Sequence, residues 1–355
     1  MPITLYGKSF LTLADFSKDE IYYLLNLAHE LKQKRQKGIP GNLLQGKNVV
    51  LLFEKSSTRT RCAFETGIIE EGGHVTYLDT TSSQFGKKES VEDSAKVWAA
   101  IYNAIGFRGF SQKTVCDLAK YSNIPVYNGL TDEDHPTQIL ADLMTIQEEL
   151  PGKSLSKIKI VFVGDTRNNL ALAWMYGCSK LGMHFVAYGP KELQPNAESL
   201  NTALKYAEQS GAVIEVTDNV ECLKNADVIY TDIWVSMGEE SKLIQRYELL
   251  KNYQITMEML NKTSNPHVLF MHCLPAFHNM ETQFAKDAFS KYGVDITEVT
   301  DEVFNSTHSV VFKESANRLH TIKAVLVATL NESFKLAPAK LFNHSDTTSQ
   351  GEVQP

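Results

Sequence analysis

The chain has 355 residues, 43% of them hydrophobic, which is typical of a soluble globular protein with room for two domains of ordinary size. Its 35 basic and 42 acidic residues give a net charge of −7, which argues against a general nucleic-acid-binding protein. Any phosphate site must therefore be locally positive within an acidic protein.

Cysteine usage and the absence of long apolar runs indicate the cellular compartment in which the protein is expected. The five cysteines are odd in number, widely spaced and without a C-x-x-C pair. Neither a disulfide framework nor a structural zinc site is therefore expected, and a reducing compartment fits. The N-terminus has no signal-peptide core or Arg-rich transit pattern, and no apolar run reaches membrane-spanning length. We expect a cytoplasmic protein with no membrane and no nucleic-acid partner.

The first half of the chain begins with a predicted amphipathic helix over 18–37, followed by apolar, strand-like runs. Ser17 and Glu20 have the spacing of a capping box, in which each residue satisfies a backbone N–H of the first turn. Apolar residues recur on one side of the helix, which indicates packing against a core. The strands predicted in this half span 49–53, 75–78 and 105–107.

The second half opens after the turn-rich segment 150–153, which makes a natural domain boundary. Strand-like runs alternate with helical patterns, so we expect an α/β fold with two doubly wound parallel-sheet domains joined by interdomain helices. From 337 to 355 the sequence turns polar, and a disordered tail is expected. Predicted strands span 158–163, 184–188, 213–216, 228–231 and 268–271, and predicted helices span 169–181 and 317–330.

The most informative motif is S-S-T-R-T-R at 56–61, between a predicted strand and a helical pattern. A helix N-terminus offers unpaired N–H groups and partial positive charge, an arrangement suited to phosphate. Ser57 is a suitable N-cap, and Arg59 and Arg61 would add full charges and forked donors. The alternative interpretation is a capped helix start that faces solvent.

Further motifs follow predicted strands or begin a helix. In H-P-T-Q at 135–138 the proline suits the first helical position, so His135 and Gln138 could face one ligand. A His-Pro turn that only starts a helix is the simpler interpretation. Cys273 and Asp232 each follow a predicted strand, where α/β proteins bind ligands. The simpler alternatives are a buried free cysteine and an aspartate that caps a turn.

A fifth segment, G-D-T-R-N-N at 164–169, lacks the glycine spacing of a dinucleotide site and argues against NAD. Taken together, S-T-R-T-R, H-P-T-Q and H-C-L-P closely resemble the signatures of the aspartate/ornithine carbamoyltransferase family, over about residues 5–335. The D-x-x-x-S-M-G element at 232–238 resembles that of members acting on ornithine. The resemblance implies carbamoyl transfer from carbamoyl phosphate to the δ-amine of L-ornithine, giving L-citrulline and phosphate, in an undetermined physiological direction. It implies small-molecule substrates, no cofactor and no metal.

The resemblance also assigns roles toward carbamoyl phosphate, position by position. Arg108 would bridge the phosphate and the carbonyl oxygen, His135 would donate to the same oxygen, and Gln138 would hold the carbamoyl nitrogen. Arg108, His135 and Cys273 are the residues expected to act in catalysis. The full set expected to contact carbamoyl phosphate is Ser57, Thr58, Arg59, Thr60, Gln84, Arg108, His135, Gln138, Cys273, Leu274 and Arg318.

For ornithine, the resemblance places the α-carboxylate on Asn169 and the backbone at Met237, and the α-ammonium on Asp232 and Ser236. Cys273 would lie near the δ-amine and orient it. This amine must be neutral to attack, whereas an unperturbed alkyl amine has a pKa of roughly 10.4. Desolvation in a closed site would favour the neutral form. Catalysis would rest on positioning and on stabilising charge, without an acyl-enzyme.

The implied organisation is a carbamoyl-phosphate domain over 1–150, to which the C-terminal helix at about 317–335 returns, and an ornithine domain over 151–316. The family's site lies at a subunit interface, so a homotrimer or an assembly of trimers is expected, with the loop around Gln84 serving a neighbour. One alternative is carbamoyl transfer to putrescine or N-acetylornithine. Another is a binding protein without turnover. A thiol hydrolase using Cys273 and His272 is disfavoured, because adjacent strand residues point to opposite faces.

Overall fold

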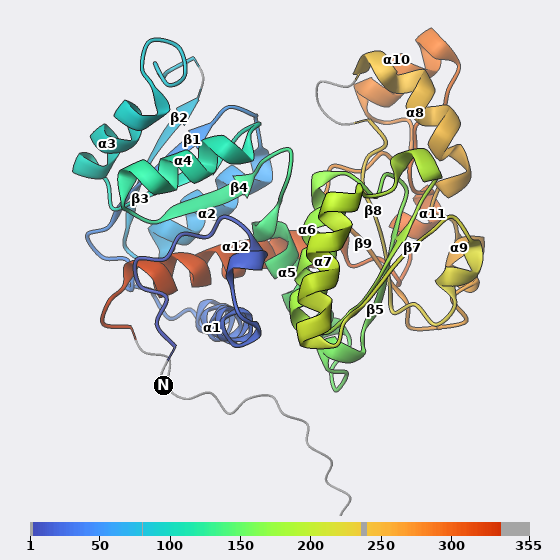
Figure 1. The fold of residues 1–355 in the computed structure, drawn as a ribbon, viewed down its shortest axis with the longest axis horizontal. Coiled ribbons are helices and arrows are strands. Elements are labelled where there is room, and N and C mark those ends of the chain that lie inside the picture. Colours follow the sequence, from blue (N-terminus) through green and yellow to red (C-terminus); the bar gives the residue numbers. More distant parts are fainter. Residues whose placement is uncertain (1–2, 80, 236–239, 335–355) are drawn as a thin grey trace, which may run out of the picture.

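The computed structural model describes residues 3–79, 81–235 and 240–334, and the chain folds around two parallel β-sheets (Figure 1). The first sheet has four strands and the second has five. The long helix α12 (Val311–Leu330) runs beneath the first sheet toward the second. The predicted α/β fold with two doubly wound parallel sheets is confirmed.

The first sheet has the strand order β2-β1-β3-β4, so its winding reverses between β1 and β3. At this point Phe53, the last residue of β1, lies beside Arg108, the last residue of β3. Doubly wound sheets bind ligands where the winding reverses, outside the carboxyl ends of the strands. The elements are β1 (Asn48–Phe53), α2 (Thr58–Glu70), β2 (His74–Asp79), α3 (Val91–Ile101), β3 (Ala104–Arg108), α4 (Gln112–Ser122) and β4 (Val126–Leu130).

The second sheet has the order β7-β6-β5-β8-β9, and its winding reverses between β5 and β8. Val163 at the end of β5 lies beside Thr231 at the end of β8, so the segments that follow these strands emerge together. The strands are β5 (Lys159–Val163), β6 (His184–Tyr188), β7 (Val213–Thr217), β8 (Val228–Thr231) and β9 (Leu269–His272). The helices are α6 (Asn169–Leu181), α7 (Ala197–Ser210), α8 (Leu243–Leu250), α9 (Met257–Asn261), α10 (Gln283–Tyr292) and α11 (Asp301–Phe304).

Two helices, α5 (Pro136–Glu149) and α12, contact elements of both halves of the chain, and α1 (Lys18–Gln36) packs against both of them. Helix α12 packs against α1, α2 and α5. One hydrophobic cluster includes Phe64 of α2, Leu326 of α12 and Phe162 of β5, so the sheets share a continuous core. Because α5 and α12 are buried almost throughout, any polar side chain on them must find a partner or a function.

Most predicted elements agree with the structure, including the capping box of Ser17 and Glu20. No pattern in the sequence predicts β4, because Asn128 and Gly129 interrupt its apolar run. Helix α12 begins at Val311 rather than at residue 317, because Lys313 and neighbouring polar residues conceal its first turn. The polar tail predicted over 337–355 lies outside the described residues.

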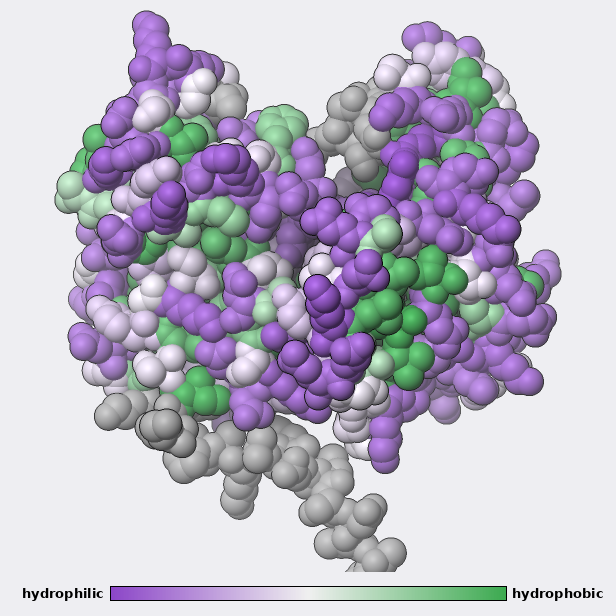
Figure 2. Space-filling model, in the orientation of Figure 1, coloured by the Kyte–Doolittle hydropathy of each residue, from purple (hydrophilic) through white to green (hydrophobic). Residues whose placement is uncertain are grey.

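The molecular surface is mainly hydrophilic on the face shown in Figure 2, and a notch separates the upper parts of the two lobes. None of the described helices combines the length and the apolar character that crossing a membrane requires.

Candidate active site between the two sheets

The anion-binding side of the site begins where β1 passes into α2. Ser57 is the N-cap of α2, with an extended backbone, and its side chain accepts a hydrogen bond from the N–H of Thr60 at 3.3 Å. The helix therefore begins as the S-T-R-T-R motif predicts. Its N-terminus lies next to the carboxyl end of β1, at the reversal point of the first sheet. This position gives an anion access to the first N–H groups of α2.

Two arginines from distant parts of the chain converge on Thr60. Its Oγ1 accepts a hydrogen bond from Nη2 of Arg318 at 2.6 Å and from Nη1 of Arg108 at 3.3 Å. Burial, and then the neighbouring Arg318, lower the pKa of Arg108 to about 9. Burial and Arg59 lower the pKa of Arg318 to about 10. The positive charges are thus unfavourable to one another until an anion compensates them.

Hydrogen-bond donors without partners on the same arginines also indicate an anion-binding site. The Nε atoms of Arg59, Arg108 and Arg318 are buried, and none has a hydrogen-bond partner among the described residues. Buried N–H groups without partners are rare in folded proteins, and each one calls for an explanation. A phosphate group accepts several hydrogen bonds from guanidinium groups and carries the compensating charge.

Arg61 does not join this cluster, which corrects the expectation that both arginines of the motif serve the phosphate. Its Nε donates to Glu65 Oε1 at 2.8 Å, and its guanidinium lies 3.6 Å from the centre of the Tyr77 ring. Residues two apart on an α-helix lie about 200° apart around its axis, so Arg59 and Arg61 cannot face the same ligand.

His135 and Gln138 lie on the first turn of α5, as the H-P-T-Q motif predicts. His135 is the N-cap, with Pro136 at the first helical position. Burial, and then the charges of Arg318 and Arg108, hold the pKa of His135 well below its usual range. The imidazole is therefore neutral at physiological pH and has one N–H to donate. Gln138 donates through Nε2 to Asp142 Oδ1 at 2.8 Å, whereas its buried Oε1 has no partner among the described residues.

Sequence reasoning missed a buried polar network beside Gln138, formed by Asp142, Tyr230 and Glu314. Tyr230 donates to Asp142 Oδ2 at 3.0 Å, and its hydroxyl lies 3.4 Å from Glu314 Oε1. Burial raises the pKa of Asp142 to about 7, and burial together with Asp142 raises the pKa of Glu314. Helical spacing is the signal that could have found both carboxyls: Asp142 follows Gln138 by one turn, and Glu314 precedes Arg318 by one turn.

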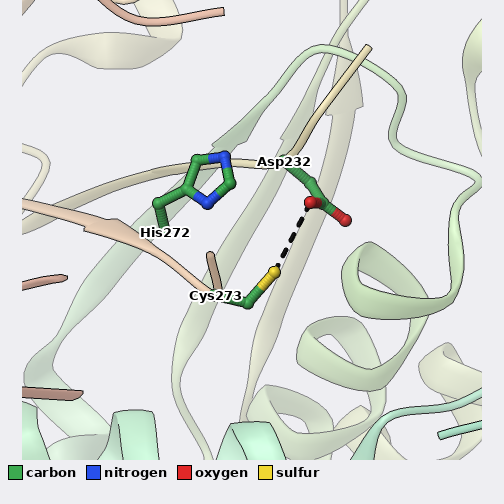
Figure 3. Close-up of side chains that lie close together, drawn as sticks. All are labelled: Asp232, His272 and Cys273. Carbon is green, nitrogen blue, oxygen red and sulfur yellow. Dashed lines mark hydrogen bonds between the residues drawn. The ribbon is translucent and has the colours of Figure 1, made fainter. Parts of the chain in front are cut away.

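The opposite side of the site is formed by Asp232 after β8 and Cys273 after β9, which face each other in Figure 3. The Cys273 thiol donates to Asp232 Oδ1 at 3.4 Å, and Asn168 Nδ2 donates to Oδ2 at 3.3 Å. Burial, and then the adjacent Asp232, raise the pKa of Cys273 well above its usual range. Cys273 is therefore a neutral thiol, and not the thiolate that nucleophilic catalysis requires.

A ring nitrogen of His272 lies within 4.8 Å of the Cys273 sulfur, nearer than expected for adjacent strand residues, but the ring also contacts a second buried carboxyl, that of Glu298. The Nδ1 of His272 accepts from the N–H of Leu274 at 3.0 Å, and its Nε2 lies 3.2 Å from Glu298 Oε1. Burial lowers the pKa of His272 to about 4 and raises the pKa of Glu298 to about 8, so both groups are neutral at pH 7. His272 is therefore not available as a base for Cys273, against the thiol-hydrolase alternative.

Asp232, His272 and Cys273 also form a group whose potential metal-ligand atoms lie within 4.8 Å of one another. The ring of His272 does not suit a metal, because Nδ1 already accepts a hydrogen bond and Nε2 faces a protonated carboxyl. A metal needs a free nitrogen lone pair on a histidine ligand. The arrangement fits a hydrogen-bonding pocket better than a metal centre.

The remaining predicted site residues have varied surroundings. Asn169 donates through Nδ2 to the carbonyl of Thr131 at 2.5 Å, which joins α6 to the loop after β4. Leu274 is half-buried and has a φ of 59°, a conformation uncommon for a residue with a branched side chain. Gln84 is exposed, on the loop between β2 and α3. Ser236 and Met237 lie outside the described residues.

Two family models match consecutive parts of the chain. The carbamoyl-P binding domain of aspartate/ornithine carbamoyltransferase matches residues 8–148, and the Asp/Orn binding domain matches residues 156–329. The first match contains the arginine cluster apart from Arg318, and the second contains Asp232 and Cys273.

Curated relatives and solved structures agree with these matches. The catabolic ornithine carbamoyltransferase of Clostridium perfringens is 60% identical over 331 residues, covering 93% of this chain and 99% of the relative. The ornithine carbamoyltransferase of Limosilactobacillus reuteri is 53% identical, covering 94% of this chain and 99% of its own. The structure of the Pyrococcus furiosus ornithine carbamoyltransferase superposes with a TM-score of 0.84 at 37% identity. The match covers 94% of this chain and 100% of that chain. The chain therefore belongs to the aspartate/ornithine carbamoyltransferase family.

Proposed function

We propose that this chain transfers the carbamoyl group of carbamoyl phosphate to the δ-amine of L-ornithine, giving L-citrulline and phosphate. The observation that carries the proposal is the cluster of Arg59, Arg108 and Arg318, whose buried Nε atoms have no partner among the described residues, opposite the pair formed by Asp232 and Cys273. One side suits a phosphorylated donor and the other suits a cationic amino acid. Relatives that match nearly the whole chain bear the name ornithine carbamoyltransferase.

In this proposal the phosphate binds at the N-terminus of α2, to Ser57, Thr58, Arg59 and Thr60. The neutral imidazole of His135 donates to the carbonyl oxygen, and Arg108 bridges that oxygen and the phosphate. Both groups stabilise the negative charge that develops as the carbonyl carbon becomes tetrahedral. The unpaired Oε1 of Gln138 accepts a hydrogen bond from the carbamoyl nitrogen. Leu274 and Cys273 complete the pocket, and Arg318 lies near the carbamoyl group.

Ornithine approaches from the second sheet. Asp232 and Ser236 take its α-ammonium, and Asn169 with the backbone at Met237 takes its α-carboxylate. The Cys273 thiol orients the δ-amine, which attacks in its neutral form. The new C–N bond forms as the C–O bond to phosphate breaks, and the departing phosphate is a base that can accept the proton lost by the amine. The reaction is reversible, and its physiological direction depends on metabolite levels.

The first experiment measures citrulline formation from carbamoyl phosphate and ornithine, with putrescine, N-acetylornithine and aspartate run in parallel. We expect a strong preference for ornithine. Preference for another amine would retain the carbamoyl-phosphate side of the proposal and overturn the ornithine side. Absence of product with every amine would contradict an enzymatic role and favour a protein that only binds.

We further propose a homotrimer, or an assembly of trimers, as the active form. The exposed position of Gln84 supports this, because a side chain on that loop is available to the site of a neighbouring subunit. The proposed domains are 1–150 with the returning C-terminal helix, and 151–316. The dispersed cysteines support a cytoplasmic location. Light scattering on the purified chain tests the assembly, and a mass of one subunit would contradict it.

A further inference from the structure

Two buried carboxyl groups stand beside Gln138 without any role in the chemistry proposed above. Asp142 on α5 and Glu314 on α12 are both fully buried, as is Tyr230 on β8. Burying ionisable groups is costly unless hydrogen bonds compensate, and hydrophobic replacements are often at least as stable. We therefore look for a role of these two carboxyl groups other than stabilising the fold.

The geometry fixes which end of the Gln138 amide faces the carboxyls. Its Nε2 lies 2.8 Å from Asp142 Oδ1 and 3.4 Å from Glu314 Oε1. The two ends of a glutamine amide have nearly the same shape but opposite hydrogen-bonding character, so only the surroundings select an orientation. With carboxyl oxygens as the partners of Nε2, Oε1 is left at the other end of the amide. It is buried and has no partner among the described residues.

We propose that Asp142 and Glu314 orient the Gln138 amide so that the site accepts a carbamoyl group and rejects an acetyl group; the inference rests on the proposed function. A carbamoyl group has an NH₂ that donates to Oε1. An acetyl group has a methyl in its place and would leave that buried oxygen unpaired. Sites that bind a substrate through buried hydrogen-bonding groups discriminate strongly against analogues lacking the partner. If the amide turned over, two NH₂ groups would meet and this preference would be lost.

The carboxyls are themselves held in place. Tyr230 donates to Asp142 Oδ2 at 3.0 Å, and the N–H of His272 donates to Glu314 Oε2 at 3.2 Å. The network thus links α5, α12, β8 and the end of β9, which Cys273 directly follows. Asp142 and Glu314 act through Gln138, so they are positioning residues.

The test is a double-mutant cycle of Asp142→Asn and Gln138→Ala on the full-length enzyme. Asparagine offers both a donor and an acceptor to Gln138, so the amide no longer has one preferred orientation. The readouts are the KM for carbamoyl phosphate and the inhibition constants of acetyl phosphate and inorganic phosphate. We expect Asp142→Asn to reduce the preference for carbamoyl over acetyl phosphate on the order of tenfold. Inhibition by inorganic phosphate should be unchanged, because the arginine cluster is intact.

In the Gln138→Ala background, Asp142→Asn should change the preference by less than about twofold, since the amide through which it acts is gone. Additive effects, or an unchanged preference in the single variant, would overturn the inference. Asp227→Asn is the matched control, because Asp227 is also buried but accepts from the N–H of Lys159 in the second sheet. Its preference should equal that of the wild type.

Glu314→Gln is the second variant, used if Asp142→Asn does not fold, and it should shift the preference in the same direction. Citrulline formation by the wild type separates this inference from the proposed function. A wild type without turnover overturns the function itself. An active wild type whose Glu314 and Asp142 variants retain full preference overturns only the role of the carboxyls.

Discussion

The two sides of the site differ in how far the protein satisfies its own polar groups. Around the N-terminus of α2, the Nε atoms of three arginines have no hydrogen-bond partner within the part of the chain that the structure describes. Across the site, the Asp232 carboxylate accepts hydrogen bonds from the Cys273 thiol, the Asn168 amide and the N–H of Ile233. The first side thus presents unsatisfied donors to an anion, whereas the carboxylate on the second side already accepts internal hydrogen bonds.

This difference distinguishes two ways of preparing a site. Cationic side chains that repel one another and have unpaired donors attract a phosphate strongly, but they lower the stability of the folded protein. Groups that are hydrogen-bonded within the protein lower its stability little. Because a ligand must displace those hydrogen bonds when it binds, each such group contributes less net affinity. Removing a group from the arginine side should therefore cost far more activity than removing one from the Cys273 side.

The largest effect is expected for Arg108→Ala. Loss of a charge-assisted donor to both phosphate and carbonyl oxygen should lower kcat/KM for carbamoyl phosphate by about 10³-fold or more. The same variant should unfold at no lower a temperature, because burial holds the pKa of Arg108 down to about 9 and the charge is unfavourable in the free protein. Steady-state kinetics and thermal unfolding check both statements.

Arg61→Ala is the matched control, since Arg61 belongs to the same motif but binds Glu65. Its kcat/KM should stay within about twofold of the wild type, as for an exposed helical ion pair. Near-normal turnover in Arg108→Ala would refute the role given to the arginine side.

A smaller loss is expected for Asp232→Asn, which keeps the shape of the side chain but removes its charge. The KM for ornithine should rise by about 30-fold or more, as when one partner of a buried charge pair is lost. Binding of inorganic phosphate should remain as in the wild type. Asp227→Asn again serves as the control for loss of a buried carboxylate. Equal weakening of phosphate and ornithine binding would show that the two sides are not separable.

Cys273→Ala should have a still smaller effect, mainly on ornithine and on its pH dependence. Burial raises the pKa of Asp232, and the hydrogen bond from Cys273 opposes that rise. Without the thiol the pKa of Asp232 rises further, so the ionised form that binds ornithine is lost at a higher pH as the solution is acidified. The acidic limb of kcat/KM for ornithine should therefore move to higher pH.

Cys273→Ser supplies a hydroxyl donor to Asp232 and should return the acidic limb toward its wild-type position. The measurement is a pH profile of kcat and kcat/KM for all three proteins. Superimposable profiles for Cys273→Ala and the wild type would remove Cys273 from the binding of the amine.

The smallest expected effect concerns stability, at Glu298 behind His272. Burial raises the pKa of Glu298 from 4.5 to about 8, so the folded state retains a proton that the unfolded state releases. Its contribution to stability is fully present below about pH 4.5 and is lost as pH rises to about 8. Glu298→Gln should unfold at a temperature a few degrees above the wild type at pH 8, and at nearly the same temperature at pH 4.5. A pH-independent difference in unfolding temperature would contradict this linkage.

Much of the site was predictable because its residues fall at the ends of regular elements. The capping serine of α2 and the turn at His135 follow from short motifs whose geometry is local. The outward orientation of Arg61 was also within reach, because helical periodicity separates it from Arg59. Helical spacing also places Glu314 one turn before Arg318, but its burial was not predictable, because its partners lie on α5, β8 and β9 and only long-range packing makes a buried carboxyl tolerable there.

The mutual repulsion of Arg59, Arg108 and Arg318 has a consequence for the lifetime of the protein. A ligand that binds only the folded state stabilises it by about 2.7 kcal/mol at a hundredfold excess over its Kd. Phosphate compounds that bind the arginine cluster should thus stabilise the folded chain, in addition to any role as substrates. When the donor is scarce, the fraction of unfolded chains rises, and these are the chains that proteases remove. The supply of one metabolite would then set both the rate of the enzyme and its abundance.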